Sequence, residues 1–94
     1  MPDQPVQFHA IVHGLVQGVG YRDTTRWQAS ELGLTGWVRN RPDGTVETVA
    51  QGSRETLAQF IAFLHQGPPM AKVTQVDVTW QDATETFDGF EMRF

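Results

Sequence analysis

The 94-residue chain contains no cysteine. A disulfide framework, a thiolate nucleophile and a cysteine-based zinc site are therefore all excluded. Long apolar runs are also missing, because no segment approaches the ~20 residues that a membrane-spanning helix requires. The first ten residues, MPDQPVQFHA, lack the basic segment and apolar core of a secretory signal. We therefore expect a soluble cytoplasmic protein with no membrane partner.

Positive charge is scarce as well. Seven Lys and Arg residues stand against 11 Asp and Glu residues, which gives a net charge of -4. Proteins that bind nucleic acid usually present a basic surface, because contacts with phosphate supply much of the affinity. We therefore expect no nucleic-acid partner. The length, with 39% hydrophobic and 19% charged residues, predicts one globular domain over residues 1–94.

Apolar residues alternate with other residues in several short segments, as in strands with one buried face. The predicted strands are Val6–Val12, residues 35–40 (TGWVRN), residues 45–51 (TVETVAQ), Val73–Trp80 and a short final strand, Phe90–Phe94. Between the second and third strands, RPDG has the residues of a turn: Pro42 fixes its own φ, and Gly44 is free to take a positive φ. These two strands should therefore form a hairpin.

Two segments have the period of amphipathic helices. The first covers about residues 22–32 and ends at Gly33, a typical C-cap. The second begins after the N-cap candidate Ser53 and stops before Gly67. The resulting order is β-α-β-β-α-β with one further strand. It predicts an α+β, ferredoxin-like sandwich: a mainly antiparallel sheet, two helices on one face and a short extra C-terminal strand.

The stretch HGLVQGVGYRD, residues 13–23, places three glycines within seven positions between the first strand and the first helix. It is not a Walker A loop, because Val19 stands where the second glycine is required and no Lys-Ser/Thr pair follows. It is not a dinucleotide fingerprint either, because Asp23 takes the third glycine's place. Two interpretations stay open: an anion-binding nest assisted by Arg22, or a simple loop with a surface arginine.

The blocks GLVQGVGYRDTT, LGLTGWVRNRPDGTVE, QG and GPPMAKV follow one another with a spacing that resembles the acylphosphatase family, from Phe8 to Phe94. The resemblance implies a ferredoxin-like fold. It also implies metal-independent hydrolysis of acyl phosphates to a carboxylate and inorganic phosphate, with no cofactor. The substrate would be a small-molecule acyl phosphate, and phosphate or sulfate would bind at the same site. We expect a monomer.

The resemblance also implies roles for individual residues. The backbone of the loop would form a phosphate cradle from Leu15, Val16, Gln17, Gly18, Val19 and Gly20. Arg22 would bind the phosphoryl group, and Asn40 would orient the attacking water. An amide both donates and accepts hydrogen bonds but is not a strong base, so the role of Asn40 would be orientation. Thr25 matches a supporting position. Some family members have a hydroxyl residue directly after the asparagine, where this chain has Arg41.

The histidines do not predict a metal site. His9 and His13 share a strand face but lie about 13 Å apart at ~3.3 Å per residue, too far to ligate one zinc ion at ~2.1 Å. His65 ends the second helix, where a cationic side chain is favourable. The clustered carboxylates near the C-terminus, Asp82, Glu85, Asp88 and Glu91, are expected in a solvated loop and edge.

The element order and the family resemblance are also compatible with two other kinds of protein. An RNA-recognition module has the same element order, but TVETVAQG does not match its RNP1 motif and the chain is acidic. An acylphosphatase-like domain also occurs at the start of larger carbamoyl-transfer maturation proteins. The chain ends at Phe94 without a linker, which favours an independent enzyme.

The aromatic residues expected in the core are Phe8, Phe60, Phe63, Phe87, Phe90 and Phe94. Trp27 is either a packing residue against a neighbouring loop, which we expect, or an exposed contact for a partner.

Overall fold

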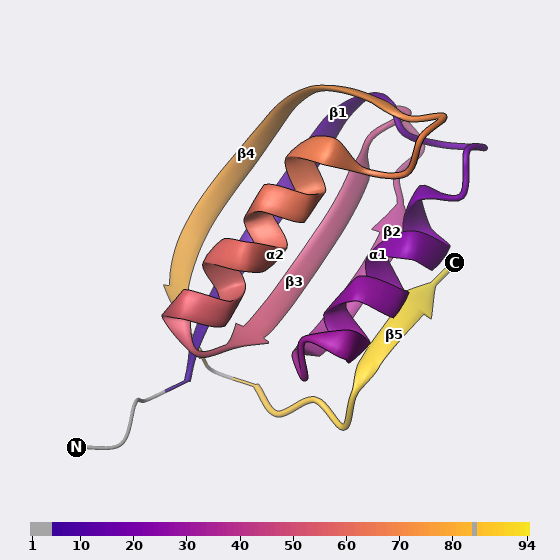
Figure 1. Cartoon of the computed structure of the whole chain (residues 1–94). Coiled ribbons are helices and arrows are strands. Elements are labelled where there is room, and N and C mark those ends of the chain that lie inside the picture. The colour runs from indigo at the N-terminus through magenta and orange to yellow at the C-terminus, as the bar shows by residue number, and fades with distance from the viewer. Residues whose placement is uncertain (1–4, 84) are drawn as a thin grey trace.

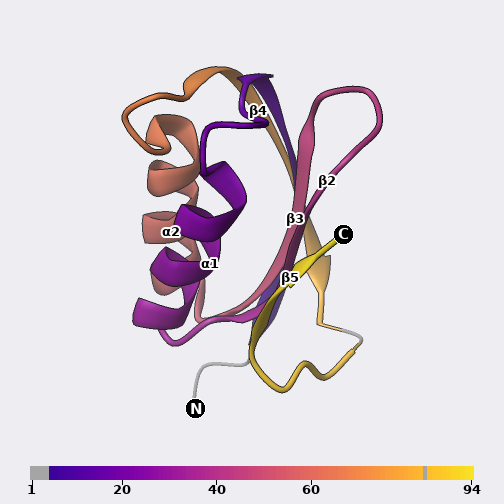
Figure 2. The same cartoon turned by 90° about the vertical axis from the view of Figure 1, so that its right-hand side faces the viewer.

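Two helices lie across one face of a five-stranded sheet in the computed structural model, which describes residues 5–83 and 85–94 (Figure 1). The elements are β1 (Val6–Leu15), α1 (Tyr21–Glu31), β2 (Thr35–Asn40), β3 (Val46–Gly52), α2 (Arg54–Gln66), β4 (Lys72–Asp82) and β5 (Phe90–Arg93). Figure 2 shows α1 and α2 on the same side of the sheet. The predicted α+β, ferredoxin-like order with its extra strand is confirmed.

The sheet is mainly antiparallel, as predicted. Its strand order is β4-β1-β3-β2-β5. β1 pairs antiparallel with β3 and β4, and β2 pairs antiparallel with β3. The short strand β5 pairs in parallel with β2, with Val38 opposite Met92. This pairing brings the C-terminal segment beside the hairpin strand that carries Asn40.

The first strand is longer than its alternation pattern predicts. β1 continues past Val12 to Leu15, which pairs with Lys72 of β4 after a register shift between His13 and Gly14. Gly14 has a φ of +122°, and a Cβ there would collide with the Lys72 carbonyl. Only glycine fits so close to a neighbouring backbone. The first glycine of the motif therefore belongs to the sheet, and the connecting loop is residues 16–20.

The core lies between the sheet and the helices. Alternate residues of β1 point inward, and each helix contributes one apolar face, as the two periods predict. The fully buried side chains include Phe8, Val12, Tyr21, Val38, Val46, Leu57, Phe60 and Leu64. Ser53 caps α2 as predicted, because its side chain accepts a hydrogen bond from the Thr56 N–H.

Two aromatic residues lie elsewhere than expected. Trp27 is 61% exposed on the outward face of α1, so the prediction that it packs against a loop is wrong. Phe94 is 96% exposed, so its place in the predicted core is also wrong. It follows β5 at the edge of the sheet, where alternation no longer leads to burial. The ring of Phe94 instead stacks on Arg22, with the guanidinium carbon 4.9 Å from the ring centroid.

The histidines of β1 pair with carboxylates on adjacent strands. His9 Nε2 lies 2.6 Å from Glu47 Oε2, and His13 Nε2 lies 2.9 Å from Asp77 Oδ2. Among residues 5–83 and 85–94, no three His, Asp or Glu side chains gather as a metal site would require. Neither helix in this part of the chain is long and apolar enough to cross a bilayer.

Candidate active site

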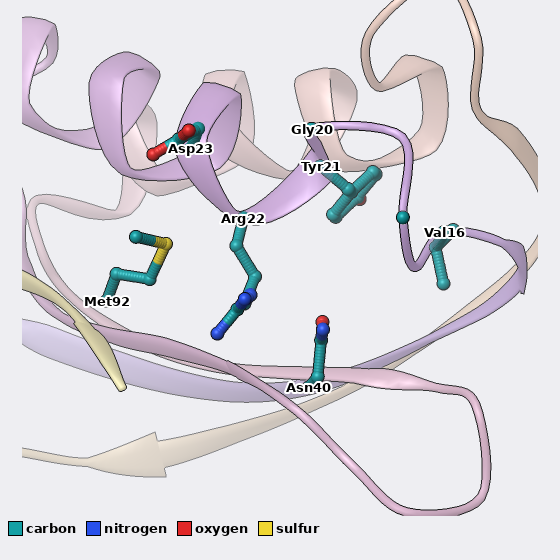
Figure 3. A pocket seen from close by; sticks show the side chains of 8 residues that line it. Val16, Gly20, Tyr21, Arg22, Asp23, Asn40 and Met92 are labelled. Atoms are coloured by element: carbon teal, nitrogen blue, oxygen red, sulfur yellow. The ribbon is translucent and has the colours of Figure 1, made fainter. Parts of the chain in front are cut away.

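A pocket of about 150 Å³ opens where the loop before α1 meets the end of β2 and the strand β5 (Figure 3). Its lining comprises Val16, Gly18, Gly20, Tyr21, Arg22, Asp23, Asn40 and Met92. The fold therefore brings together Arg22, Asn40 and three residues of the glycine-rich loop. Of the other predicted loop residues, Leu15 ends β1, and Gln17 and Val19 are not in the lining.

The glycines shape the loop that leads into α1. Gly18 has a φ of +76° and Gly20, the N-cap of α1, a φ of +80°, and both values favour glycine. No side chain caps this helix. Within the described residues, the N–H groups of residues 16–20 donate to no backbone carbonyl. Free N–H donors at a helix N-terminus form a binding site for an anion.

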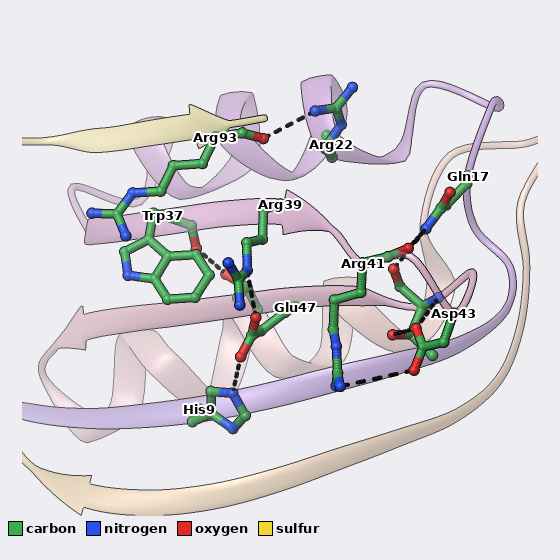
Figure 4. Close-up of polar contacts among 11 residues, drawn as sticks. His9, Gln17, Arg22, Trp37, Arg39, Arg41, Asp43, Glu47 and Arg93 are labelled. Carbon is green, nitrogen blue, oxygen red and sulfur yellow. Dashed lines mark hydrogen bonds and ion pairs between the residues drawn. The ribbon is translucent and has the colours of Figure 1, made fainter.

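Arg22 stands at the pocket on the first turn of α1. Its Nη1 donates a hydrogen bond to the Arg93 carbonyl oxygen at 3.0 Å (Figure 4). The Phe94 ring stacks on its guanidinium group. These two contacts hold the planar group beside β5. They leave its other donors for a ligand, and a guanidinium fork matches the oxygens of a phosphoryl group.

Asn40 is the last residue of β2 and pairs with Val46 of β3. Its half-buried side chain points toward the loop, on the same side of the sheet as Arg22 (Figure 3). In the described part of the chain, its amide makes no side-chain hydrogen bond. Both the oxygen and the nitrogen of that amide are therefore free to bind a water molecule or a ligand.

The side chain of Gln17 connects the loop to the β2–β3 turn. Its Nε2 donates to the Arg41 carbonyl at 2.7 Å and to the Thr45 carbonyl at 2.9 Å (Figure 4). Arg41 directly follows Asn40, so this pair of bonds fixes the loop relative to the end of β2. The backbone of Arg41 thus takes part in ordering the site.

The turn itself is ordered by a carboxylate. Asp43 Oδ1 accepts hydrogen bonds from the Thr45 hydroxyl at 2.6 Å and from the Thr45 N–H at 3.0 Å. These bonds favour the charged form and hold the pKa of Asp43 below its usual range. The Gly44 N–H closes the turn onto the Arg41 carbonyl at 3.2 Å. The predicted RPDG hairpin is therefore confirmed.

Two polar residues of α1 are buried, and one of them, Tyr21, lines the pocket. The Tyr21 hydroxyl donates to the Leu64 carbonyl of α2 at 2.6 Å, and burial raises the pKa of this phenol well above its usual range. Tyr21 therefore acts as an anchor between the helices and not as a base. Thr25 is completely buried, and its hydroxyl finds no partner among the described residues. It does not line the pocket, so its supporting role stays a prediction.

Three lining residues, Tyr21, Asp23 and Met92, are not among the residues predicted for the site. Asp23 could have been found, because it stands directly after Arg22 on the first turn of a predicted helix. Met92 carried no such signal. Its place depends on the parallel pairing of β5 with β2, which joins segments far apart in the sequence.

Comparisons with known proteins agree on one family. The acylphosphatase family model matches residues 8–92. The acylphosphatase of Pelotomaculum thermopropionicum is 52% identical over 86 residues, which cover 92% of this chain and 94% of that protein. That of Thermococcus kodakarensis is 47% identical over 87 residues, 93% of this chain and 94% of the relative. The crystal structure of acylphosphatase from Bacillus subtilis superposes with a TM-score of 0.92 at 38% identity, covering 95% of this chain and 99% of that one. The chain belongs to the acylphosphatase family.

Proposed function

We propose that this acylphosphatase hydrolyses the carboxyl–phosphate bond of acyl phosphates in the pocket between Arg22 and Asn40. The observation that carries the proposal is the meeting of three features in one pocket: a guanidinium group, the Asn40 amide and the loop before α1. Among the described residues, that amide has no hydrogen-bond partner and the loop N–H groups donate to no backbone carbonyl. An acyl phosphate has an anionic end to be held and a carboxylate that leaves readily. Catalysis then requires positioning and charge stabilisation more than a covalent nucleophile.

In this mechanism the loop N–H groups and Arg22 bind the phosphoryl oxygens. The oxygen of the Asn40 amide accepts a hydrogen bond from water and directs a lone pair of that water at phosphorus. A new bond forms between the water oxygen and phosphorus, the bond from phosphorus to the acyl oxygen breaks, and that oxygen leaves as carboxylate. Arg22 stabilises the charge that spreads over the phosphoryl oxygens in the transition state.

The water proton needs an acceptor. Asn40 cannot serve, because an amide is a very weak base. The Tyr21 hydroxyl is committed to the Leu64 carbonyl. Asp23, the carboxylate of the lining, lies across Arg22 from Asn40 (Figure 3). We therefore assign the proton to an oxygen of the phosphoryl group itself, which leaves as inorganic phosphate. This assignment needs neither a metal nor a cofactor.

Hydrolysis of benzoyl phosphate and acetyl phosphate by the purified protein tests the proposal. We expect loss of the acyl phosphate well above the uncatalysed rate, with the same rate in the presence of EDTA. A rate at the uncatalysed background would overturn the proposed function. A rate that EDTA abolishes and added divalent metal restores would overturn the metal-independent mechanism.

Two substitutions test the residue roles. Arg22→Ala should raise KM about tenfold or more and lower kcat, because a charge-assisted contact to the phosphoryl group is lost. Asn40→Ala should lower kcat by about 100-fold with little change in KM, because Asn40 acts on the water. Arg26→Ala is the matched control, since Arg26 is exposed on the same helix outside the pocket. A normal kcat in Asn40→Ala would refute the role given to Asn40.

Several expectations stay predictions and have direct tests. Inorganic phosphate or sulfate should inhibit competitively and shift the amide NMR signals of Gly18 and Gly20. Light scattering should give the mass of a monomer. The cytoplasmic location is checked by cell fractionation, and the single domain over residues 1–94 by one cooperative unfolding transition.

A further inference from the structure

The pocket has two ends that differ in chemistry. In Figure 3, Val16 and Asn40 lie on one side of Arg22, while Asp23 and Met92 lie on the other. The first end carries the free N–H groups of the loop and suits the phosphoryl group. The second end has a carboxylate and a thioether and offers nothing to an anion. A substrate held at the first end by its phosphate has its acyl group near the second.

Asp23 places a negative charge in a pocket that is proposed to bind an anion. The residue is exposed on the first turn of α1, and within the described residues it takes part in no ion pair. An acidic residue in the first turn also stabilises the helix through its dipole, which is a purely structural reason for its presence. A role in helix stability and a role in substrate binding can be told apart, because only a charge close to the bound substrate discriminates between acyl groups.

Met92 forms the apolar part of the same end. It is half-buried on β5, opposite Val38 of β2, and its flexible side chain reaches the pocket. A thioether on three rotatable bonds adapts to apolar groups of different shape. The exposed ring of Phe94 covers one face of Arg22. The acyl end therefore combines apolar surface with one negative charge.

We propose that Asp23 and Met92 form the acyl-group subsite and that this subsite selects uncharged, apolar acyl groups over acyl groups with a second negative charge. The inference rests on the proposed function, because it takes the phosphoryl group to lie at the loop. Asp23 repels a second anion, and Met92 contacts the apolar part of the acyl group. Asp23 is therefore a specificity-determining residue of this chain.

Benzoyl phosphate and 4-carboxybenzoyl phosphate are a matched pair for the test, because they differ by one carboxylate on a rigid ring. We expect the wild-type protein to have the higher kcat/KM for benzoyl phosphate. Asp23→Asn keeps the shape of the side chain and removes its charge. It should reduce the preference by roughly two- to fivefold, the range for an exposed pair of charges. Removing the charge also favours binding of the phosphoryl group, which both substrates share. The test therefore compares the ratio of the two kcat/KM values between the variant and the wild-type protein.

Two controls separate selection from a structural effect. Glu31→Gln removes a negative charge from the other end of α1, and it should leave the preference unchanged. The wild-type preference should also shrink as salt is raised, because exposed charges are screened. An unchanged preference in Asp23→Asn, in protein shown to be folded by circular dichroism, would overturn the inference. If wild-type protein fails to hydrolyse benzoyl phosphate at all, the proposed function fails instead.

Met92 gives a second test that does not depend on charge. Met92→Ala should raise KM for benzoyl phosphate several-fold more than KM for acetyl phosphate, because the smaller acyl group offers little apolar surface. Met92→Leu keeps the apolar volume and should restore most of the difference. Equal changes in KM for both substrates would place the acyl group elsewhere and overturn the subsite.

Discussion

The side chain of Gln17 offers the sharpest test of how the site is held together. Its two hydrogen bonds, at 2.7 Å and 2.9 Å, join the loop of residues 16–20 to the carbonyls of Arg41 and Thr45 on either side of the β2–β3 turn. Gln17→Met removes both donors and keeps an unbranched chain of similar length. The substitution therefore cuts the connection between the loop and Asn40 with little change in packing.

The expected loss of stability follows from what remains bonded. The Arg41 carbonyl still accepts from the Gly44 N–H at 3.2 Å, and the Thr45 carbonyl still accepts from the Arg41 N–H at 2.9 Å. Neither carbonyl is left without a partner, so the full penalty of an unsatisfied buried group does not apply. Two ordinary hydrogen bonds then amount to about 1–2 kcal/mol of unfolding free energy. In a domain of this size, that is a fall in Tm of roughly 5–15 °C.

The effect on catalysis should exceed the effect on stability. In the proposed mechanism the loop holds the phosphoryl group and Asn40 aims the water, so a shift between them of about 1 Å would be enough to lower kcat by up to 100-fold. Urea unfolding and benzoyl phosphate kinetics measure the two effects, and Gln59→Met, an exposed glutamine of α2, is the control. An unchanged unfolding free energy would refute the hydrogen-bond argument. A normal kcat in a destabilised variant would show that the connection serves stability alone.

Substitutions of Thr25, Glu47 and Phe94 each test the surroundings of one side chain. Thr25→Val should raise the unfolding free energy, measured in urea, by about 1 kcal/mol, because a buried hydroxyl that has no partner among the described residues is replaced by a methyl group. A large fall in kcat would instead support the role implied by the family. Partial burial of Glu47 acts to raise its pKa, but hydrogen bonds from His9 and Arg39 outweigh it and hold the pKa below its usual value. The stability from this depressed pKa is complete above the ordinary glutamate pKa and is lost as the pH falls through the lowered value. Glu47→Gln should therefore lower the unfolding free energy at pH 7 and make it less dependent on pH in the acidic range. An unchanged pH profile of the unfolding free energy, measured in urea, would contradict this. Phe94→Ala should raise KM for benzoyl phosphate about two- to fivefold, because the guanidinium group of Arg22 loses the ring that holds it in place. The Tm should change little, because Phe94 is 96% exposed. Equal KM values in the variant and the wild-type protein would mean that the stacking does not position Arg22.

The fold was predictable because its signals are local. Alternation in β1 and the apolar faces of α1 and α2 each need only a short window of sequence. The errors in β1 and at Phe94 arise because strand pairing and the position of a strand in the sheet depend on distant parts of the sequence. β1 runs on to Leu15 because β4 is there to pair with it, and Phe94 is exposed because β5 lies at the edge of the sheet.

The site was less accessible to reasoning from residues. The loop and Arg22 suggest an anion site by themselves, but nothing in the spacing links them to Asn40, which entered through the family resemblance. Asp23 and Met92 entered only with the three-dimensional structure. The side chain of Gln17 turns toward the β2–β3 turn, a direction that no periodicity encodes in a loop.

The hydrogen bond between Arg22 and the Arg93 carbonyl makes the last strand part of the candidate active site. β5 has four residues and one neighbour in the sheet, β2. About half of the chain lies between these two strands, so their short pairing closes a long loop. Such a strand opens locally at low free energy, before the rest of the sheet. An opened β5 carries away both the acceptor of Arg22 and the side chain of Met92. A ligand that binds only when β5 is paired with β2 should therefore slow the hydrogen exchange of the β5 amide protons. Catalytic activity then depends on the pairing of this last strand.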